Sequence, residues 1–484
     1  MNFNIIKSEG GDNLSDNKYK TLLSNTLLIS LGTFGSKLLV FLMVRFYTGY
    51  LTPSDYGTAD LITQTANLLF PIISLGITEA VFRFALDGVK ERSSVFSLGF
   101  FSITAGAVLF FAITPILTLV KEFNGYIWLI ILYTMASCYH SLCAQYIRAV
   151  GKTALFAIQG IINTLLVILL NITFLAVFRL GVTGYVLSVV LADTLCTLFL
   201  FFKERLWKVI TFHPKKSLFY DMLKYSIPLI PATVFWWITS VSDRYMVNGF
   251  IGSEANGIYA VSYKLPTLLT LVSSVFMQAW QFSAVSEAQG DKKEHAEFFT
   301  KVWGSFQAVM FIVGAFITAF AKPAIKLLTT DEYYSAWKYV PLLSVSMVFT
   351  AFVSFTGTVY VVNKKSGISF ITALVGAATN IILNFILIPS PLGVQGAAIA
   401  TVTSYFVVFV IRCFNTRKYI PFKLQGIRVI LNSVIVIVQT VVMVLELKYW
   451  IAVQVLSLIL LFIINFKLLL DSVSPILKSV LRRR

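Results

Sequence analysis

The sequence predicts an all-α polytopic membrane protein of about fourteen transmembrane helices, arranged as two pseudo-symmetric six-helix lobes plus two extra C-terminal helices. Three observations lead to this fold class: the composition, the length of the apolar runs, and a short hinge that occurs twice. Hydrophobic residues make up 57% of the 484 residues and charged residues 13%, and the mean hydropathy is +0.81. Since a soluble domain carries about 25% charged residues, this chain could not cover a surface that faces water.

The apolar runs have the length that crosses a bilayer, which is about twenty residues. They are too long and too continuous for the strands of a membrane barrel, so helices are expected. The runs lie near 22–46, 58–82, 95–119, 126–148, 155–177, 181–202, 226–250, 257–283, 302–321, 339–361, 368–388, 394–412, 426–445 and 450–470.

The distribution of basic residues along the chain indicates its orientation in the membrane. Of the 39 Lys and Arg residues, most fall on the segments that share a side with the N-terminus, as expected when both termini are cytosolic. The basic loops need no partner beyond anionic lipids of the inner leaflet, and nucleic-acid binding is not expected. The expected divisions are a cytosolic tail (1–20), an N-lobe (21–202), a basic cytosolic linker (203–224), a C-lobe (225–412), and a last segment (413–484) with the extra helices and a basic cytosolic end.

Two hinges recur in the same order. "TGYLTPSDYGTADL" at 48–61 matches "NGFIGSEANGIYAV" at 248–261, so that Gly57 corresponds to Gly257. "RLGVTGYVLS" at 179–188 matches "PLGVQGAAIA" at 391–400. The first and second sets of six spans are therefore two copies of one unit. Because six is even, the copies are parallel repeats, a design that places a transporter's substrate site between its halves.

The chain resembles a known family in its opening "LLSNTLLISLGTFGSKLLVFLMVRFYTGYLTPSDYGTADL" and in "YSIPLIPATVFWWITSVSDRYMVNGFIGSEANGIYAVSYKLP", which begins the second half. These patterns are similar to those of the polysaccharide transporters, the oligosaccharide flippases of the multidrug/oligosaccharidyl-lipid/polysaccharide exporter superfamily. The resemblance implies a two-lobed fold that exports lipid-linked glycans, commonly undecaprenyl-pyrophosphate oligosaccharides, across a bacterial cytoplasmic membrane. It also implies a place in cell-surface polysaccharide biosynthesis, with a polysaccharide polymerase and glycosyltransferases as partners.

Ionisable groups inside spans cost roughly 2.5–3.5 kcal/mol each, so they indicate function. The sequence predicts a headgroup cavity in which cations replace water around the phosphates of the lipid and glutamines bond sugar hydroxyls. The resemblance implies a role for central basic residues of the first and eighth helices in headgroup binding, and Lys37 and Lys264 are the candidates for that role here. The full set of expected substrate-binding residues is Lys37, Arg244, Lys264, Arg45, Gln64, Gln278 and Gln281.

Two interpretations of Asp243 are open: it binds an ion or a proton, or it pairs with a nearby cation. The second interpretation is favoured. Pro71 and Pro266 interrupt the second and eighth spans and predict bends there. His140 is read as a packed polar residue. The sequence contains no phosphate-binding GxxxxGK[ST] loop and no Cys/His cluster, so no cofactor or metal is expected.

Three other functions compete with lipid-linked oligosaccharide export. A flippase for lipid II, the peptidoglycan precursor, would share the helix count and the cationic cavity. A multidrug/cation antiporter would have an acidic cavity, twelve helices and no extra pair. A membrane enzyme would need a large outer loop carrying carboxylates or histidines, whereas the expected outer loops are short, so a transporter rather than an enzyme is expected.

Overall fold

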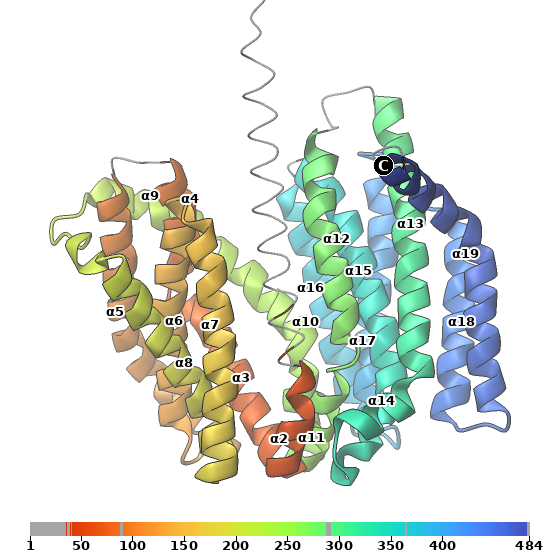
Figure 1. The fold of residues 1–484 in the computed structure, drawn as a ribbon, viewed down its shortest axis with the longest axis horizontal. Helices are drawn as coiled ribbons and strands as arrows, with labels where there is room; N and C mark the ends of the chain where they lie inside the picture. The colour runs from red at the N-terminus through yellow and green to blue at the C-terminus, as the bar shows by residue number, and fades with distance from the viewer. Residues whose placement is uncertain are drawn as a thin grey trace, which may run out of the picture. The chain divides into compact units, whose positions relative to one another are not determined.

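The computed structural model of the protein describes residues 41–87, 91–119, 121–286, 292–363 and 365–481, together with Gly35 and Leu39. Within these residues the chain is helical and contains no strand, which confirms the predicted fold class (Figure 1). Packing divides the chain into two compact units. Unit 1 holds residues 69–230 of the described chain, and unit 2 holds 44–68 and 231–481. The lobes expected at 21–202 and 225–412 stay a prediction.

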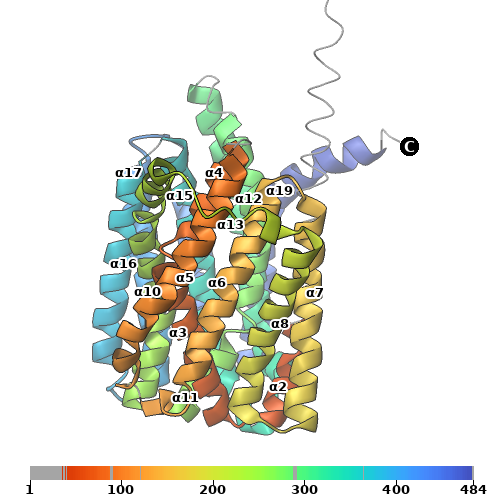
Figure 2. The same cartoon turned by 90° about the vertical axis from the view of Figure 1, so that its left-hand side faces the viewer.

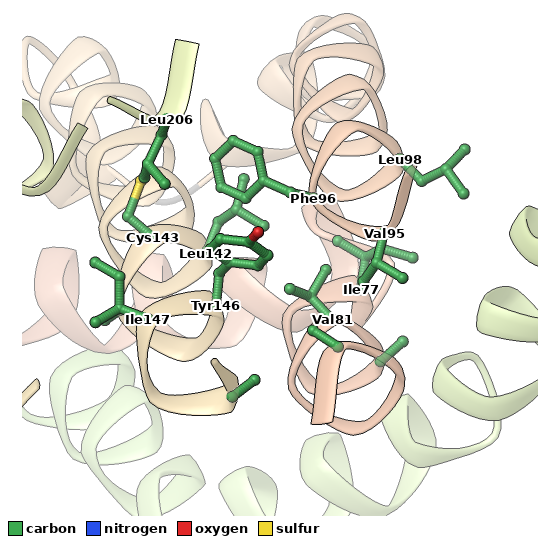
Figure 3. Packing of buried hydrophobic residues seen from close by; sticks show 14 of the residues in the cluster. Ile77, Val81, Val95, Phe96, Leu98, Leu142, Cys143, Tyr146, Ile147 and Leu206 are labelled. Carbon is green, nitrogen blue, oxygen red and sulfur yellow. The ribbon is translucent and has the colours of Figure 1, made fainter. Parts of the chain in front are cut away.

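Unit 1 consists of helices that pack along their lengths, with α6 against α8 and α7, and α4 against α5, α6 and α9. Figure 3 shows the core between them, in which Phe96, Leu142, Tyr146 and Val81 point towards one another. The helices are α4 (Ile77–Asp87), α5 (Arg92–Leu117), η2 (Lys121–Phe123), α6 (Ile127–Ala149), α7 (Thr153–Asn171), η3 (Ile172–Val177), α8 (Gly181–Lys203), η4 (Leu206–Lys208) and α9 (Lys216–Ser226).

Unit 2 is built around α15 and α17, which pack against each other. An aromatic cluster that includes Trp303, Phe352 and Phe409 fills the space between them and α13. The two C-terminal helices α18 and α19 pack against α13. The helices of this unit are α2 (Val44–Tyr50), most of α3 (Pro53–Ile73), α10 (Leu229–Phe250), α11 (Ser253–Ser262), α12 (Thr267–Ser286), α13 (Lys292–Ala319), α14 (Ala321–Leu328), η6 (Asp331–Lys338), α15 (Val340–Val362), α16 (Ser366–Leu387), α17 (Val394–Thr416), α18 (Gly426–Val444) and α19 (Trp450–Leu481).

Ten helices of the described chain are long and apolar enough to cross a membrane, and twelve spans result when each of two bent pairs counts as one. The expected single spans at 58–82 and 257–283 are these pairs. α3 and α4 meet at 54°, and α11 and α12 meet at 45°. The bend predicted from Pro266 is thereby confirmed. α3 continues past Pro71 to Ile73, and the break comes at residues 74–76, where Leu75 and Gly76 have left-handed φ angles of 51° and 61°. The first expected span, 22–46, lies mostly outside the described residues. The seventh expected span, 226–250, corresponds to α10, which carries Asp243 and Arg244.

The repeat found in the sequence reappears in the backbone. Both copies break their second span, and Gly181 and Gly393 at the second hinge have left-handed φ angles of 55° and 52°. Gly184 and Gly396, three residues on, lie against Phe174 and Leu387 at the end of the preceding helix. The two copies therefore share the conformation of the hinges as well as their sequence.

The first hinge pair forms a close helix crossing inside unit 2. A Cβ atom added to Gly57 would lie 2.1 Å from the carbonyl oxygen of Ser253, and one added to Gly257 would lie 1.8 Å from that of Pro53. Across this crossing Asn256 Nδ2 donates to the carbonyl of Gly57 at 3.0 Å, and Ser54 and Ser253 share a hydrogen bond of 2.7 Å. Helices in a membrane gain little from apolar contact alone, so such small-residue crossings hold them together.

We expect Gly257→Ala to lower the free energy of unfolding by about 1–3 kcal/mol, because the new methyl group has no room at the crossing. The measurement is the apparent melting temperature of purified protein in detergent, followed by tryptophan fluorescence. Gly249→Ala is the matched control, because Gly249 also lies in a helix and has no atom near its Cβ position. Equal melting temperatures for the two variants would contradict a tight crossing at Gly57 and Gly257.

Candidate functional site

Two of the charged residues expected within spans, Asp243 and Arg244, lie on α10 in unit 2, close to α3 and α11. Arg244 on α10 pairs with Asp60 on α3, and its guanidinium lies 4.7 Å from the centre of the Tyr263 ring. The side chains of Arg244 and Asp60 are only 11% and 8% exposed, so the ion pair is buried. Arg244 Nε and Asp60 Oδ2 have no hydrogen-bond partner within the described part of the chain, which leaves one donor and one acceptor for a further group.

Asp243 lies next to Arg244 in the sequence, yet its carboxylate does not pair with that guanidinium. Its Oδ2 accepts hydrogen bonds from the hydroxyls of Tyr259 and Tyr263, both at 2.7 Å, and from Thr401 at 3.2 Å. The carboxylate is completely buried. No ion pair of Asp243 is present within the described residues, and both interpretations of Asp243 stay predictions.

The surroundings of Asp243 continue as a network of side-chain oxygens on three helices. Asn380 on α16 donates to Thr401 of α17 at 3.4 Å, and its Oδ1 accepts from Asn384 at 2.9 Å and from Ser242 at 2.9 Å. Each of these groups is uncharged, and among the described residues the charge that acts on Asp243 besides them is that of Arg244, which is paired with Asp60. An isolated carboxylate in such a place is costly unless it is protonated or binds a cation.

The other expected substrate-binding residues are spread more widely. Lys264 lies in the break between α11 and α12, half-buried, with its Nζ 5.8 Å from the centre of the Tyr56 ring. Arg45 on α2 is exposed, and Gln64 on α3 is half-buried. Lys37 and the side chains of Gln278 and Gln281 lie outside the described residues. Arg244 thus lies on α10, Gln64 on α3 and Lys264 just after α11, while Arg45 lies on a separate short helix.

A pocket of about 300 Å³ lies between α12 and α15 in unit 2, and five of its eight lining residues are Ser or Thr. Three of these hydroxyls donate to carbonyls of their own helices: Ser274 to Leu271, Thr350 to Ser346 and Ser354 to Thr350. A hydroxyl that donates its hydrogen in this way keeps its lone pairs for an incoming donor. The pocket therefore presents hydrogen-bond acceptors, which sequence reasoning missed because single Ser and Thr residues are common in membrane helices.

Known proteins share both the sequence pattern and the fold. A family model described as polysaccharide biosynthesis protein matches residues 42–338. The chain belongs to that family. The match agrees with the resemblance to polysaccharide transporters noted in the sequence. A search of curated proteins found no match.

Solved structures of transporters have the same fold as this chain at low sequence identity. A structure titled lipid II flippase MurJ, in an inward closed conformation, is 14% identical, with a TM-score of 0.70 over 92% of this chain and 99% of that chain. An inward-facing multidrug resistance MATE family transporter of the MOP superfamily is also 14% identical, with a TM-score of 0.65 over 79% and 95%. The Vibrio cholerae MATE transporter VcmN has 14% identity and a TM-score of 0.57 over 82% and 96%. At such identities the likeness establishes the fold.

Removing one member of the buried ion pair is expected to destabilise the protein strongly. Asp60→Asn leaves the Arg244 charge without its counter-charge, and we expect a loss of about 3–5 kcal/mol in the free energy of unfolding. The double variant Asp60→Leu/Arg244→Met removes both charges and should recover most of that loss. Thermal unfolding in detergent measures both, and additive losses in the double variant would contradict the pairing.

Proposed function

We propose that the protein moves a polyprenyl-pyrophosphate oligosaccharide from the cytosolic to the outer leaflet of a bacterial cytoplasmic membrane by alternating access. The observation that carries this proposal is the family match over residues 42–338 on a chain with the fold of superfamily transporters. The transported molecule would supply cell-surface polysaccharide biosynthesis, in which a polymerase and glycosyltransferases act before or after it. Both termini lie in the cytosol under this proposal, which rests on the distribution of basic loops.

The pyrophosphate would meet cations contributed by several helices. Lys264 supports this role because its half-buried ammonium has only an aromatic ring as a neighbour among the contacts of the described chain. Lys37 and Arg45 are proposed as further phosphate ligands. Arg244 contributes less net charge than the sequence suggests because Asp60 neutralises it, but its Nε still offers one donor.

Sugar hydroxyls would bind to amide and hydroxyl groups rather than to charges. Gln64, Gln278 and Gln281 remain the proposed amides. The pocket between α12 and α15 adds acceptors for sugar O–H donors, and it lies on the helix that follows Lys264. One molecule with an anionic headgroup and an attached glycan would therefore find both kinds of partner along α12.

The proposed transport can be measured in proteoliposomes loaded with radiolabelled undecaprenyl-pyrophosphate oligosaccharide. We expect Lys37→Ala and Lys264→Ala each to lower the translocation rate about tenfold or more, because a charge-assisted hydrogen bond contributes about 1.5–3 kcal/mol. Lys448→Ala is the matched control, an exposed lysine between α18 and α19. Equal rates for all variants would remove the cationic site from the proposal.

A parallel assay with lipid II tests the alternative substrate. The likeness to the lipid II flippase structure makes this the second candidate. Translocation of lipid II without translocation of the oligosaccharide would replace the proposed substrate class. Movement of cationic drugs without either lipid would favour the multidrug antiporter instead.

We also propose that Asp243 binds a monovalent cation that is coupled to transport. Its hydrogen-bonded neighbours are the hydroxyl oxygens of Tyr259, Tyr263 and Thr401, and hard cations prefer oxygen ligands. At fixed pH, replacing sodium by choline should slow wild-type transport several-fold and leave Asp243→Asn unchanged. Asp331→Asn, an exposed carboxylate on η6, should respond like the wild type. A sodium response that persists in Asp243→Asn would exclude this site.

A further inference from the structure

A second buried polar cluster lies inside unit 1, where α6, α7 and α8 run side by side (Figure 2). His140 Nδ1 on α6 lies 3.1 Å from Asp193 Oδ1 on α8. The same carboxylate accepts hydrogen bonds from Ser137 at 2.6 Å and from Asn163 on α7 at 2.8 Å. The other ring nitrogen, His140 Nε2, lies 2.7 Å from Oε1 of Gln159, also on α7. None of these five residues belongs to the proposed substrate site.

The cluster lies deep within membrane-length helices. α6, α8 and the continuous run Thr153–Val177 each qualify as candidate spans. Asp193 is near the middle of the 23-residue helix α8, about 18 Å from its first residue and about 15 Å from its last at a rise of 1.5 Å per residue. Asp193 is 7% exposed and Gln159 is 5% exposed. An acid and a histidine at such depth are costly and therefore indicate function.

The hydrogen bonds of the ring fit two protonation states. Nδ1 donates to the Asp193 carboxylate in both. With Gln159 Oε1 facing the ring, Nε2 must also carry a proton, which makes the ring an imidazolium. If the Gln159 amide turns over, its NH₂ group donates to an unprotonated Nε2 instead. The cluster can thus accept or release one proton by rotating a single amide.

The charges around the cluster are few. Tyr133 on α6 and Cys196 on α8 are the other titratable side chains that act on Asp193 among the described residues. The groups that α7 presents, Gln159 and Asn163, are neutral. With the ring protonated, the His140–Asp193 pair has no net charge, and without that proton the pair carries one negative charge. In a low-dielectric interior this difference is large enough to change which conformations are favoured.

We propose that His140, held by Asp193 and Gln159, is a proton-binding site through which a pH difference across the membrane is coupled to transport. The coupling rests on the proposed function, whereas proton binding does not. Histidine is suited to the task because its unperturbed charge change falls between pH 5 and 8. A proton that enters and leaves the cluster during the transport cycle links unit 1 to the proton gradient, independently of the cation proposed at Asp243 in unit 2.

Proton binding can be tested without any substrate. The protein is labelled with ¹⁵N on its histidine rings, placed in lipid nanodiscs and titrated by NMR from pH 4.5 to 9. The His140 signal, identified by its loss in His140→Gln, should change reversibly with pH over this range. In Asp193→Asn its midpoint should move by at least one pH unit. A His140 signal that stays constant throughout would overturn the proton site.

Coupling is tested in the proteoliposome assay with radiolabelled undecaprenyl-pyrophosphate oligosaccharide, with the membrane potential clamped by valinomycin and potassium. A pH difference of about one unit should change the wild-type rate at least threefold. The ratio of rates with and without the gradient should fall to one in His140→Gln, and it should keep its wild-type value in His213→Gln, an exposed histidine before α9. A merely structural histidine would alter both rates and leave their ratio unchanged, which would overturn the coupling.

The two assays separate the failure of this proposal from that of the proposed function. If the wild type moves no oligosaccharide at all, the proposed function fails and the coupling fails with it, while the NMR titration still decides the proton site. If the wild type transports without responding to the pH gradient, the proposed function stands and the coupling is wrong.

Discussion

The close approach of Gly57 and Gly257 is the constraint on which the charged site depends. The backbones of α3 and α11 come into contact at this point, so neither position has room for a Cβ atom. The contact places α3 beside α10, so that Asp60, three residues after Gly57, reaches Arg244, and Thr65 reaches the hydroxyl of Tyr245 at 2.5 Å. A buried salt bridge between different helices needs such exact spacing, since a shift of either helix would leave two unpaired charges in a low-dielectric interior.

The sequence predicts the fold well because membrane spans are long and the repeat preserves its glycines. Gly181 and Gly393 have left-handed φ angles, which residues other than glycine rarely adopt. Because both hinges need glycine at this point, their match could be identified from the sequence. The bent spans α3–α4 and α11–α12 could be located only approximately. Apolar residues continue through each bend, so hydropathy shows one segment where the structure has two helices.

Partners within the site were less predictable, because consecutive residues of a helix point about 100° apart. Asp243 and Arg244 are neighbours in sequence but turn to different helices, the acid to Tyr259 and Thr401 and the arginine to Asp60. His140 and Asp193 are far apart in sequence, and each alone resembles a packed polar residue. Only the packing of α6 against α8 shows that they form one cluster.

The two copies of the repeat preserve backbone geometry and differ in charged chemistry. Counting from the first hinge, Met43 takes the place of Asp243, and Gln64 that of Lys264. Counting from the second, the buried Tyr405 takes the place of Asp193. Each copy therefore holds a buried acid that its counterpart lacks: Asp193 with a histidine in unit 1, and Asp243 with hydroxyls in unit 2. The matched glycine hinges recur in both copies whereas these acids do not, so the cation proposed at Asp243 and the proton proposed at His140 would act on transport separately.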